Sequence, residues 1–399
     1  MKIQEVSKEE YDDFLNKIQN HSFLQSSAMS EVLTGRGVHT KLLGLVHEGE
    51  ILAVGLALYR KILFGQRMDL MVGASSLEID NEFLFYKHLK DFVDNSNVLK
   101  LVIKSDHTYR DFDGEGSPIT SADDDFANKM EELGYLKNDG SILPNDGFPD
   151  WQYIKDLKKF LPENYEELLK SFNQNAQRKI KKANELSINV RAIDLDEMSE
   201  FKSVTLETAQ RQGFSDKSIE YYTDFYKSFA DKCEFLTAEI DFNKSIKRLE
   251  DMLNILDKNS KKNKQRINSL NGDLDRLKEF KNKSGKDVLT LANMVLIYQK
   301  NEVVYFLGGS LSDYQKLPGA FILQYEAMKR TMMRGIERYN FFGIEGDFDG
   351  SDGVLRFKQN FNGHIIKKTG AFLYFPNPKK YKMTENLKSL KNKIISFIK

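Results

Sequence analysis

Apolar and polar residues alternate in blocks along the first hundred positions. Residues 41–60 form two apolar runs on either side of the polar positions 47–50, a pattern that predicts a β-hairpin. A further strand is expected over 67–73, and apolar positions recur at helical spacing over 81–95. The apolar run 98–103 then predicts a buried strand that ends at Lys104.

The same order of elements is predicted again later in the chain. Residues 288–298 and 302–309 read as two strands, 318–335 as an amphipathic helix and 337–343 as a strand that leads into Gly343. The order strand, strand, helix, strand therefore occurs twice, each time ending at a charged cluster. We interpret this as an internal duplication of one α/β unit, visible in the order of elements and not in residue identity.

A different pattern separates the two repeats. Leucine and isoleucine recur at spacings of three and four in two short segments: Ile246, Leu249, Leu253 and Leu256, then Ile267, Leu270, Leu274 and Leu277. These are the apolar seams of two helices, and folded together they predict an antiparallel coiled-coil arm. The predicted domains are residues 1–150 for the first unit, 151–243 and 284–399 for the second, and 244–283 for the arm.

Two further helices are expected to be basic. Residues 163–183 predict one helix whose end is crowded with Lys and Arg. Near the C-terminus, apolar positions sit among lysines and predict a basic amphipathic helix: Leu387, Leu390, Ile394, Phe397 and Ile398. Such a helix either packs on the body of the protein or lies on a membrane surface.

The charge of the chain is balanced overall but uneven locally. The 399 residues have a net charge of zero, whereas residues 244–286 hold 13 Lys or Arg and 6 Asp or Glu, and residues 376–399 hold 7 Lys and one Glu. Basic segments on an acidic body suggest contact with an anionic partner, although two solvated helical faces would give the same pattern. No apolar stretch is long enough to span a membrane. The single cysteine, Cys233, excludes a disulfide framework and is expected to begin a strand. A cytoplasmic location fits, with peripheral membrane contact as an option.

Several familiar chemistries are absent from the sequence. It contains no P-loop and no GxSxG nucleophile motif. It also contains no HExxH pair, so a dedicated metal site is not expected. Charged residues at strand ends remain. Lys104 and Asp106 follow the last strand of the first unit, and Glu345 and Lys358 follow the matching strand of the second. An acyl transfer from an ester to an amine needs a proton acceptor and a group that offsets the oxyanion, roles open to a carboxylate and a lysine.

Five segments, in order, resemble the motifs of the FemABX family of aminoacyltransferases. Residues 23–27 (FLQSS), 171–183 (SFNQNAQRKIKKA) and 208–214 (TAQRQGF), the last followed by Tyr221-Tyr222, are similar to its N-terminal motifs and basic helix. Residues 342–344 (FGI) and 357–361 (FKQNF) are similar to its final motif. Met29 stands where the family usually has tryptophan, and His107 where it usually has proline.

The resemblance implies two GNAT-like (acetyltransferase-like) units and transfer of an amino acid from aminoacyl-tRNA to the stem-peptide lysine, or to an earlier bridge residue, of a peptidoglycan precursor. It makes Lys358 the group that polarises the ester and Asp106 the proton acceptor. Substrate contacts are expected from Arg211, Tyr221, Tyr222, Lys104 and Glu345. Contacts with tRNA are expected from Arg178, Lys179, Lys182, Lys261, Lys262, Lys264 and Arg266. No cofactor is implied.

Two other functions remain open at this point. One is a CoA-dependent N-acyltransferase of the same fold, although the pyrophosphate-binding loop that such enzymes need is not found in the sequence. The other is a non-catalytic adaptor that binds RNA or a membrane through the arm and the C-terminal helix. Glu31 stands where enzymes that use nucleotide-linked precursors have a basic residue, which favours lipid II as acceptor. The sequence does not distinguish which amino acid is transferred, nor whether it is the first or a later bridge residue.

Overall fold

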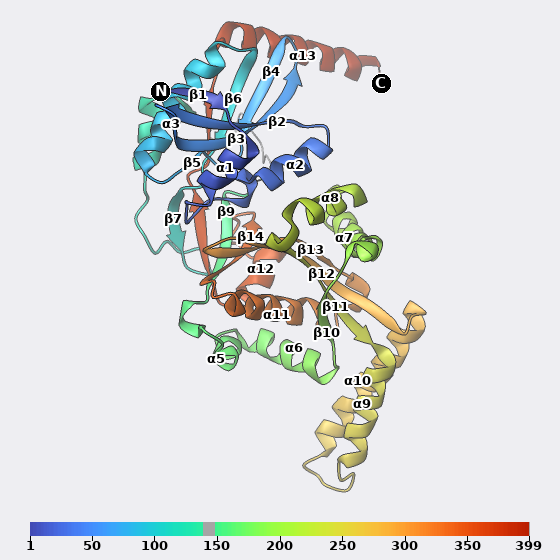
Figure 1. The fold of residues 1–399 in the computed structure, drawn as a ribbon. Coiled ribbons are helices and arrows are strands. Elements are labelled where there is room, and N and C mark those ends of the chain that lie inside the picture. The colour runs from blue at the N-terminus through green and yellow to red at the C-terminus, as the bar shows by residue number, and fades with distance from the viewer. Residues whose placement is uncertain (139–147, 399) are drawn as a thin grey trace.

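Two eight-stranded sheets, each with helices packed on it, make up the body of the molecule (Figure 1). The computed structural model describes the backbone of residues 1–138 and 148–398, and side chains up to Ser389. The predicted class, α/β with two tandem GNAT-like units and an inserted helical arm, is the one observed.

The first sheet has the strand order β1-β2-β3-β4-β6-β16-β8, and β5 pairs with β3 at its side. The elements of the N-terminal part are β1 (Lys2–Glu5), α1 (Lys8–Leu15), the 3-10 helix η1 (Phe23–Gln25), α2 (Ser27–Gly35), β2 (His39–His47), β3 (Glu50–Ile62), β4 (Gly65–Leu70), β5 (Ser75–Ser76), α3 (Ile79–Asp94), β6 (Val98–Lys104), β7 (Thr108–Phe112), α4 (Asp125–Glu132) and β8 (Leu136–Lys137). The predicted hairpin over 41–60 is confirmed as β2 and β3.

The second sheet has the order β10-β11-β12-β13-β14-β9-β15-β7. The remaining elements are β9 (Trp151–Asp156), α5 (Tyr165–Lys170), α6 (Gln174–Glu185), β10 (Asn189–Ala192), α7 (Met198–Gln212), α8 (Ile219–Phe229), β11 (Cys233–Asp241), α9 (Phe242–Ile255), α10 (Lys264–Ser284), β12 (Val288–Tyr298), β13 (Glu302–Ser310), the 3-10 helix η5 (Ser312–Tyr314), α11 (Gly319–Met333), β14 (Arg338–Ile344), α12 (Gly353–Gln359), β15 (His364–Lys368), β16 (Ala371–Tyr374) and α13 (Pro378–Ile398).

The predicted duplication is confirmed and is longer than the sequence indicated. The repeat starts at β1 in the first unit and at β10 in the second. It runs through two helices, then three antiparallel strands, and ends with a helix that leads to a strand parallel to the third. The parallel pairs are β4 with β6 and β13 with β14. The arm lies between β11 and β12, where the first unit has only the turn of its β2–β3 hairpin.

The predicted domain boundaries differ from the sheets in two places. Strand β16 pairs antiparallel with β6 in the first sheet, so the chain after residue 370 completes the first unit. Strand β7 pairs with β15 in the second sheet. Each unit therefore supplies one strand to the other, because antiparallel pairing satisfies the backbone groups of otherwise open sheet edges. The units also share an apolar core, to which α2 contributes Val32 and α8 contributes Phe225.

The single helix predicted over 163–183 is two helices. Helix α5 ends at Lys170, and α6 begins at Gln174. Asn173 stands between them with extended backbone, and its side chain accepts a hydrogen bond from the Ala176 amide. An N-cap of this kind starts a new helix, because it satisfies an amide that has no partner within the helix.

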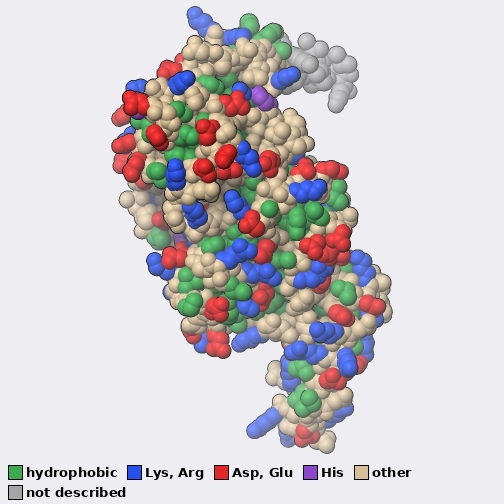
Figure 2. All heavy atoms as spheres, viewed as in Figure 1, with side chains coloured by type: hydrophobic (Ala, Val, Ile, Leu, Met, Phe, Trp, Pro, Cys, Tyr) green, Lys and Arg blue, Asp and Glu red, His purple; other side chains and the backbone are tan. Residues whose placement is uncertain are grey.

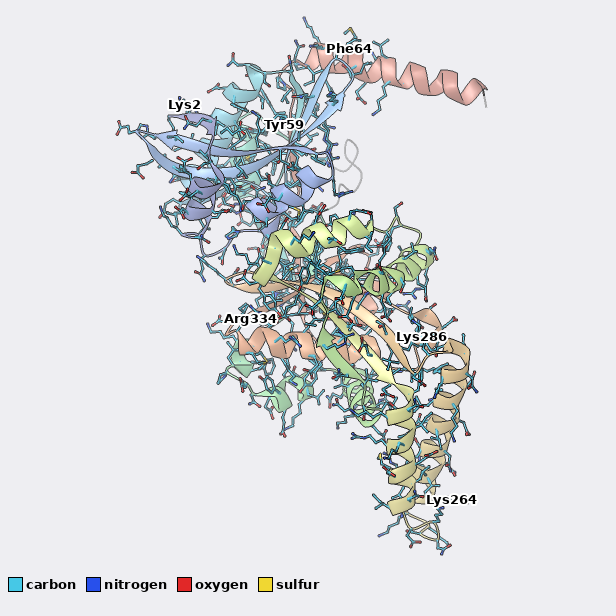
Figure 3. All side chains as sticks on the ribbon, turned by 45° about the vertical axis from the view of Figure 1, so that its right-hand side comes forward. Lys2, Tyr59, Phe64, Lys264, Lys286 and Arg334 are labelled. Carbon is cyan, nitrogen blue, oxygen red and sulfur yellow. The ribbon has the colours of Figure 1, made fainter. Side chains whose placement is uncertain are left out.

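The arm is the predicted helical hairpin, formed by α9 and α10 and projecting from the second unit (Figure 1). Figure 3 shows Lys264 at its tip and Lys286 at its base. Its root is fixed by apolar contact, since Leu249 and Leu277 belong to the core of the second unit.

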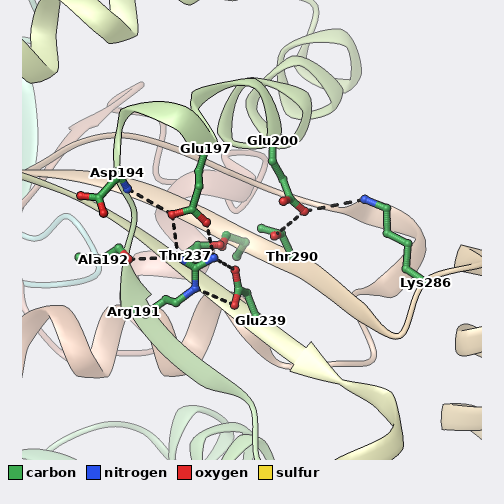
Figure 4. A network of polar contacts seen from close by, with 10 residues as sticks. Arg191, Ala192, Asp194, Glu197, Glu200, Thr237, Glu239, Lys286 and Thr290 are labelled. Carbon is green, nitrogen blue, oxygen red and sulfur yellow. Dashed lines mark hydrogen bonds and ion pairs between the residues drawn. The ribbon is translucent and has the colours of Figure 1, made fainter.

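A network of ion pairs fixes the edge of the second sheet beside this root (Figure 4). Arg191 on β10 contacts Glu239 on β11 at 2.7 Å and Glu197, ahead of α7, at 2.5 Å. The hydrogen bond from Arg191 holds the pKa of Glu197 below its usual value. Glu200 on α7 accepts a hydrogen bond from Thr290 at 3.0 Å and lies 3.8 Å from Lys286. The first turn of α7 and the base of the arm are thereby tied to the same sheet.

Candidate active site

A cavity of about 980 Å³ opens in the second unit where two parallel strands separate. β13 and β14 are paired only from Glu302 to Val304 and from Arg338 to Asn340. Beyond this ladder the strands diverge, and the other walls come from α7, α11 and α12, from β12 and from residues 148–151. Its polar lining residues include Asp150, Thr208, Arg211, Gln212, Asn293, Ser310, Gln315, Gln324, Glu345 and Lys358.

A distortion of β14 turns backbone carbonyl groups toward this cavity. The pairing of β14 with β9 slips between Asn340 and Gly343, and Phe342 has a φ of 63°. That conformation is costly for a residue with a bulky side chain. The Asn340 side chain stabilises it by accepting a hydrogen bond from the Phe342 amide at 2.7 Å. The bulge thus presents two successive carbonyl oxygens, those of Phe342 and Gly343, to one side of the strand.

Lys358 occupies the position that this bulge creates. It lies on α12, is 3% exposed, and lines the cavity. Its Nζ donates to the carbonyl oxygen of Gly343 at 2.5 Å and to that of Phe342 at 3.2 Å. Burial lowers the pKa of Lys358 to about 7, with the Asp352 carboxylate opposing the shift. Near neutral pH the side chain therefore titrates, because the Asp352 carboxylate only partly offsets the desolvation of the ammonium.

Asp352 orients the helix that carries Lys358. It is 4% exposed and is the N-cap of α12. One carboxylate oxygen accepts from the amides of Val354 and Leu355 at 2.7 and 3.0 Å, and the other accepts from the Glu345 amide at 3.1 Å. The same side chain thus fixes α12 to the end of β14. Sequence reasoning missed it, although an Asp before a Gly at the start of an apolar helix is an N-cap signal.

Three charged residues besides Lys358 line the cavity: Asp150, Arg211 and Glu345. Arg211 donates from Nη1 to the Ser310 carbonyl oxygen at 3.1 Å, which leaves its other N–H groups for a ligand. Glu207 lies one turn before Arg211 on α7, and its carboxylate accepts hydrogen bonds from the amide and the hydroxyl of Ser312. Desolvation raises the pKa of Asp150, with Lys104 and Lys367 opposing the shift. Asp150 was not among the residues expected from the sequence.

Comparison with known proteins places this site in a family. A model of the FemAB family matches residues 6–389. The chain belongs to the FemAB family. It is 25% identical to aminoacyltransferase FemA of Staphylococcus epidermidis, over 98% of this chain and 100% of that protein. It is 27% identical to aminoacyltransferase FemB of the same species, over 99% of this chain and 100% of that protein.

Two solved structures share the fold of this FemAB protein. A crystal structure of FemX matches with a TM-score of 0.74 and 19% identity, covering 96% of this chain and 99% of that one. A tandem GNAT protein from the clavulanic acid biosynthesis pathway matches with a TM-score of 0.50 and 6% identity, covering 95% and 99%. The predicted resemblance and the predicted enzyme class, an aminoacyltransferase, are confirmed.

Asp106 and Lys104 do not line the cavity of this FemAB protein. Asp106 forms an ion pair with Lys368 at 2.8 Å, because residues 368–370 run beside residues 105–107 as the chain enters β16. Lys104 is buried and donates to the Phe148 carbonyl oxygen at 3.4 Å. Asp106 is therefore held by an ion pair and is not among the residues that line the cavity, and its role as proton acceptor stays a prediction.

Tyr221 and Tyr222 are also outside the cavity. Both are buried in the apolar core shared by the two units. The Tyr222 hydroxyl donates to Asp216 at 2.7 Å, and the guanidinium of Arg36 lies 5.1 Å from the centre of the Tyr221 ring. Their side chains join the units and are not among those that line the cavity, so their contact with substrate stays a prediction.

The residues expected to touch tRNA fall into two groups. Lys182 and Arg266 are engaged in ion pairs between α6 and α10 of the arm, with Asp273 and Glu185 respectively. The others remain available at the surface: Arg178 and Lys179 on α6, and Lys261, Lys262 and Lys264 at the arm tip. In the part of the chain with described side chains, no group of three or more His, Cys, Asp or Glu residues could hold a metal ion.

Proposed function

We propose that this protein transfers an amino acid from aminoacyl-tRNA to an amine of a lipid-linked peptidoglycan precursor, and so builds the interpeptide bridge. Its FemAB membership and its relatives, which are named aminoacyltransferases, support the reaction class. The observation that carries the proposal is the buried Lys358 ammonium, held by two carbonyl oxygens at the cavity wall.

Lys358 is suited to stabilise the tetrahedral intermediate. A lysine ammonium has three N–H donors, and the carbonyl groups of Phe342 and Gly343 engage two of them. The third is free to donate to the ester carbonyl oxygen, where negative charge develops as the amine attacks. The Lys358 side chain is 3% exposed, so this donor acts more strongly than it would in bulk solvent.

The acceptor amine must lose a proton in the same reaction. Asp150 and Glu345 are the carboxylates that line the cavity, and both join Asp106 as candidates for the proton acceptor. We favour Asp150, because desolvation raises its pKa toward the range in which a carboxylate accepts protons effectively at neutral pH. Collapse of the intermediate then expels the tRNA ribose oxygen, which takes up a proton. Arg211 would hold an anionic part of either substrate.

The arm supplies a surface for the tRNA. Figure 2 shows Lys and Arg side chains over the visible face of the arm, with fewer acidic ones. Replacing Lys261, Lys262 and Lys264 by Gln should weaken tRNA binding and lower the slope of log affinity against log salt by about 2. A matched triple variant at the other end of the molecule, Lys379, Lys382 and Lys388 to Gln, should leave both quantities unchanged. Equal binding by both variants would remove the arm from this role.

One assay tests the reaction itself. The protein is incubated with a mixture of charged tRNAs and either lipid II or its nucleotide-linked precursor, and the products are read by mass spectrometry. We expect an added aminoacyl residue on the lipid-linked acceptor, with the mass of one amino acid. The absence of product with either acceptor would overturn the proposal. So would acyl transfer in a parallel incubation in which acetyl-CoA replaces the charged tRNAs.

A further inference from the structure

Four large apolar side chains are exposed together at the end of the molecule opposite the arm. Leu63 and Phe64 form the tip of the β3–β4 hairpin and are 47% and 50% exposed. Met383 and Leu387, on α13, are 49% and 40% exposed. Figure 3 shows Phe64 beside α13, and Figure 1 shows that helix and the arm at opposite ends.

The hairpin tip does not have the residues that its backbone favours. Ile62 pairs with Gly65, so Leu63 and Phe64 are the whole loop. Phe64 has a φ of 63°, a conformation for which turns normally use Gly or Asn. Two large apolar residues therefore stand at a solvent-facing position where neither the turn nor the core of the protein requires them.

Helix α13 is fixed to this hairpin by a hydrogen bond. Thr384 is 1% exposed, and its hydroxyl donates to the Leu63 carbonyl oxygen at 3.2 Å. Met383 and Leu387, four residues apart, share one side of α13, which lies next to the buried Thr384 and leaves both side chains about half exposed. The side chains of Leu390, Ile394, Phe397 and Ile398, also expected on this helix, lie outside the described ones.

Cations surround these four residues, which we call the apical patch. Arg60 and Lys61 are exposed on the hairpin, and Lys379, Lys382 and Lys388 are exposed on α13. Glu385 is the one acidic residue of segment 376–399, in a chain whose net charge is zero. An apolar centre with a basic rim complements a bilayer that has anionic headgroups above an apolar interior.

We propose that the apical patch docks on the surface of an anionic phospholipid bilayer. The two apolar turn residues enter the headgroup region, α13 lies along the surface, and the lysines contact lipid phosphates. None of the described helices is long and apolar enough to cross a membrane, so contact is from one side. An RNA partner would match the cations but give no role to Leu63 and Phe64, and a protein partner would not require the basic rim.

Sedimentation with lipid vesicles tests this proposal without any tRNA or precursor, so its outcome is independent of the proposed reaction. The wild-type protein should bind vesicles containing phosphatidylglycerol and bind pure phosphatidylcholine vesicles at least about tenfold more weakly. Leu63→Ser with Phe64→Ser should lower the affinity by about tenfold or more. The triple change of Lys379, Lys382 and Lys388 to Gln should lower it by a similar factor that shrinks as salt is added.

The arm tip provides the matched control. Ile255 is 84% exposed and is also close to several lysines, but it lies at the opposite end. Ile255→Ser should leave vesicle binding unchanged. Equal binding to both kinds of vesicle would overturn the proposal. So would a loss of binding in Ile255→Ser while the hairpin variant still binds. A third contrary result would be a wild-type protein that does not bind vesicles but forms dimers, with the hairpin variant monomeric. Thermal unfolding of each variant checks that it is folded.

Discussion

Replacing Lys358 by Met should make the protein more stable at neutral pH, and the gain should shrink as pH rises. The side chain is 3% exposed, and burial lowers its pKa from 10.5 to about 7. The unfolded chain, with an ordinary lysine pKa, therefore binds more protons than the folded protein between these two values. Stability of the wild type rises with pH across that window. Methionine has a similar shape and no charge, so it removes this dependence.

The magnitude follows from the two pKa values. A shift of this size corresponds to about 5 kcal/mol when both states are fully protonated, at pH well below 7. Between pH 7 and pH 9, the wild type should gain about 2 kcal/mol of unfolding free energy relative to Lys358→Met. Titratable groups common to both proteins cancel in this difference.

Urea unfolding of both proteins at several pH values between 6 and 10 measures it. Lys155 offers a matched comparison, because it is also buried in the second unit and its pKa is lowered to about 8. It donates to the Asn362 carbonyl oxygen at 2.9 Å and does not line the cavity. Lys155→Met should show the same trend with a gain of about 1 kcal/mol. A pH-independent difference for Lys358→Met would show that this lysine is solvated, and would refute the reasoning.

Four further variants test the cavity and the core that joins the two units. Asp352→Asn keeps an N-cap but removes the charge that raises the pKa of Lys358, so the pH above which transfer declines should move to lower values; an unchanged pH–rate profile would contradict this. Gly309→Ala places a Cβ 2.8 Å from the Val204 carbonyl oxygen and should lower the transfer rate by about tenfold or more, whereas Gly353→Ala meets nothing closer than 3.7 Å and should be neutral; equal rates would show that the wall at Gly309 yields. Tyr222→Phe should cost about 1 kcal/mol of unfolding free energy through the lost bond to Asp216 and leave the KM for the acceptor unchanged; a raised KM would return Tyr222 to the substrate site.

Local sequence patterns predicted most helices and strands of this fold, but they did not predict which strands pair across long distances in the chain. The hairpin over 41–60 and the arm follow from spacing within a few residues. The exchange of β7 and β16 between the sheets does not, because both are short strands whose partners lie far away in the chain. The break between α5 and α6 could have been predicted from Asn173, a residue that favours the N-cap of a helix. It was not, because apolar positions at helical spacing continue on both sides of Asn173.

The site shows a similar division. Lys358 was found through the family motif, but its environment depends on the bulge at Phe342, for which the sequence gives no sign. Asp106 was correctly expected at a strand end, yet the returning chain supplies Lys368 to neutralise it. Asp150 precedes β9, a strand whose place between β14 and β15 is set by pairing with later segments. Its position in the cavity wall depends on that pairing.

The most direct test of the proposed role of Lys358 is the single-turnover rate of aminoacyl transfer by Lys358→Met at pH 7. The rate should fall by about 100-fold or more, as expected when one donor to the oxyanion is removed. The affinity for aminoacyl-tRNA should be unchanged, and Lys155→Met should transfer at the wild-type rate. A Lys358→Met enzyme within about threefold of the wild type, a change worth less than about 1 kcal/mol of activation free energy, would contradict the role assigned to this lysine.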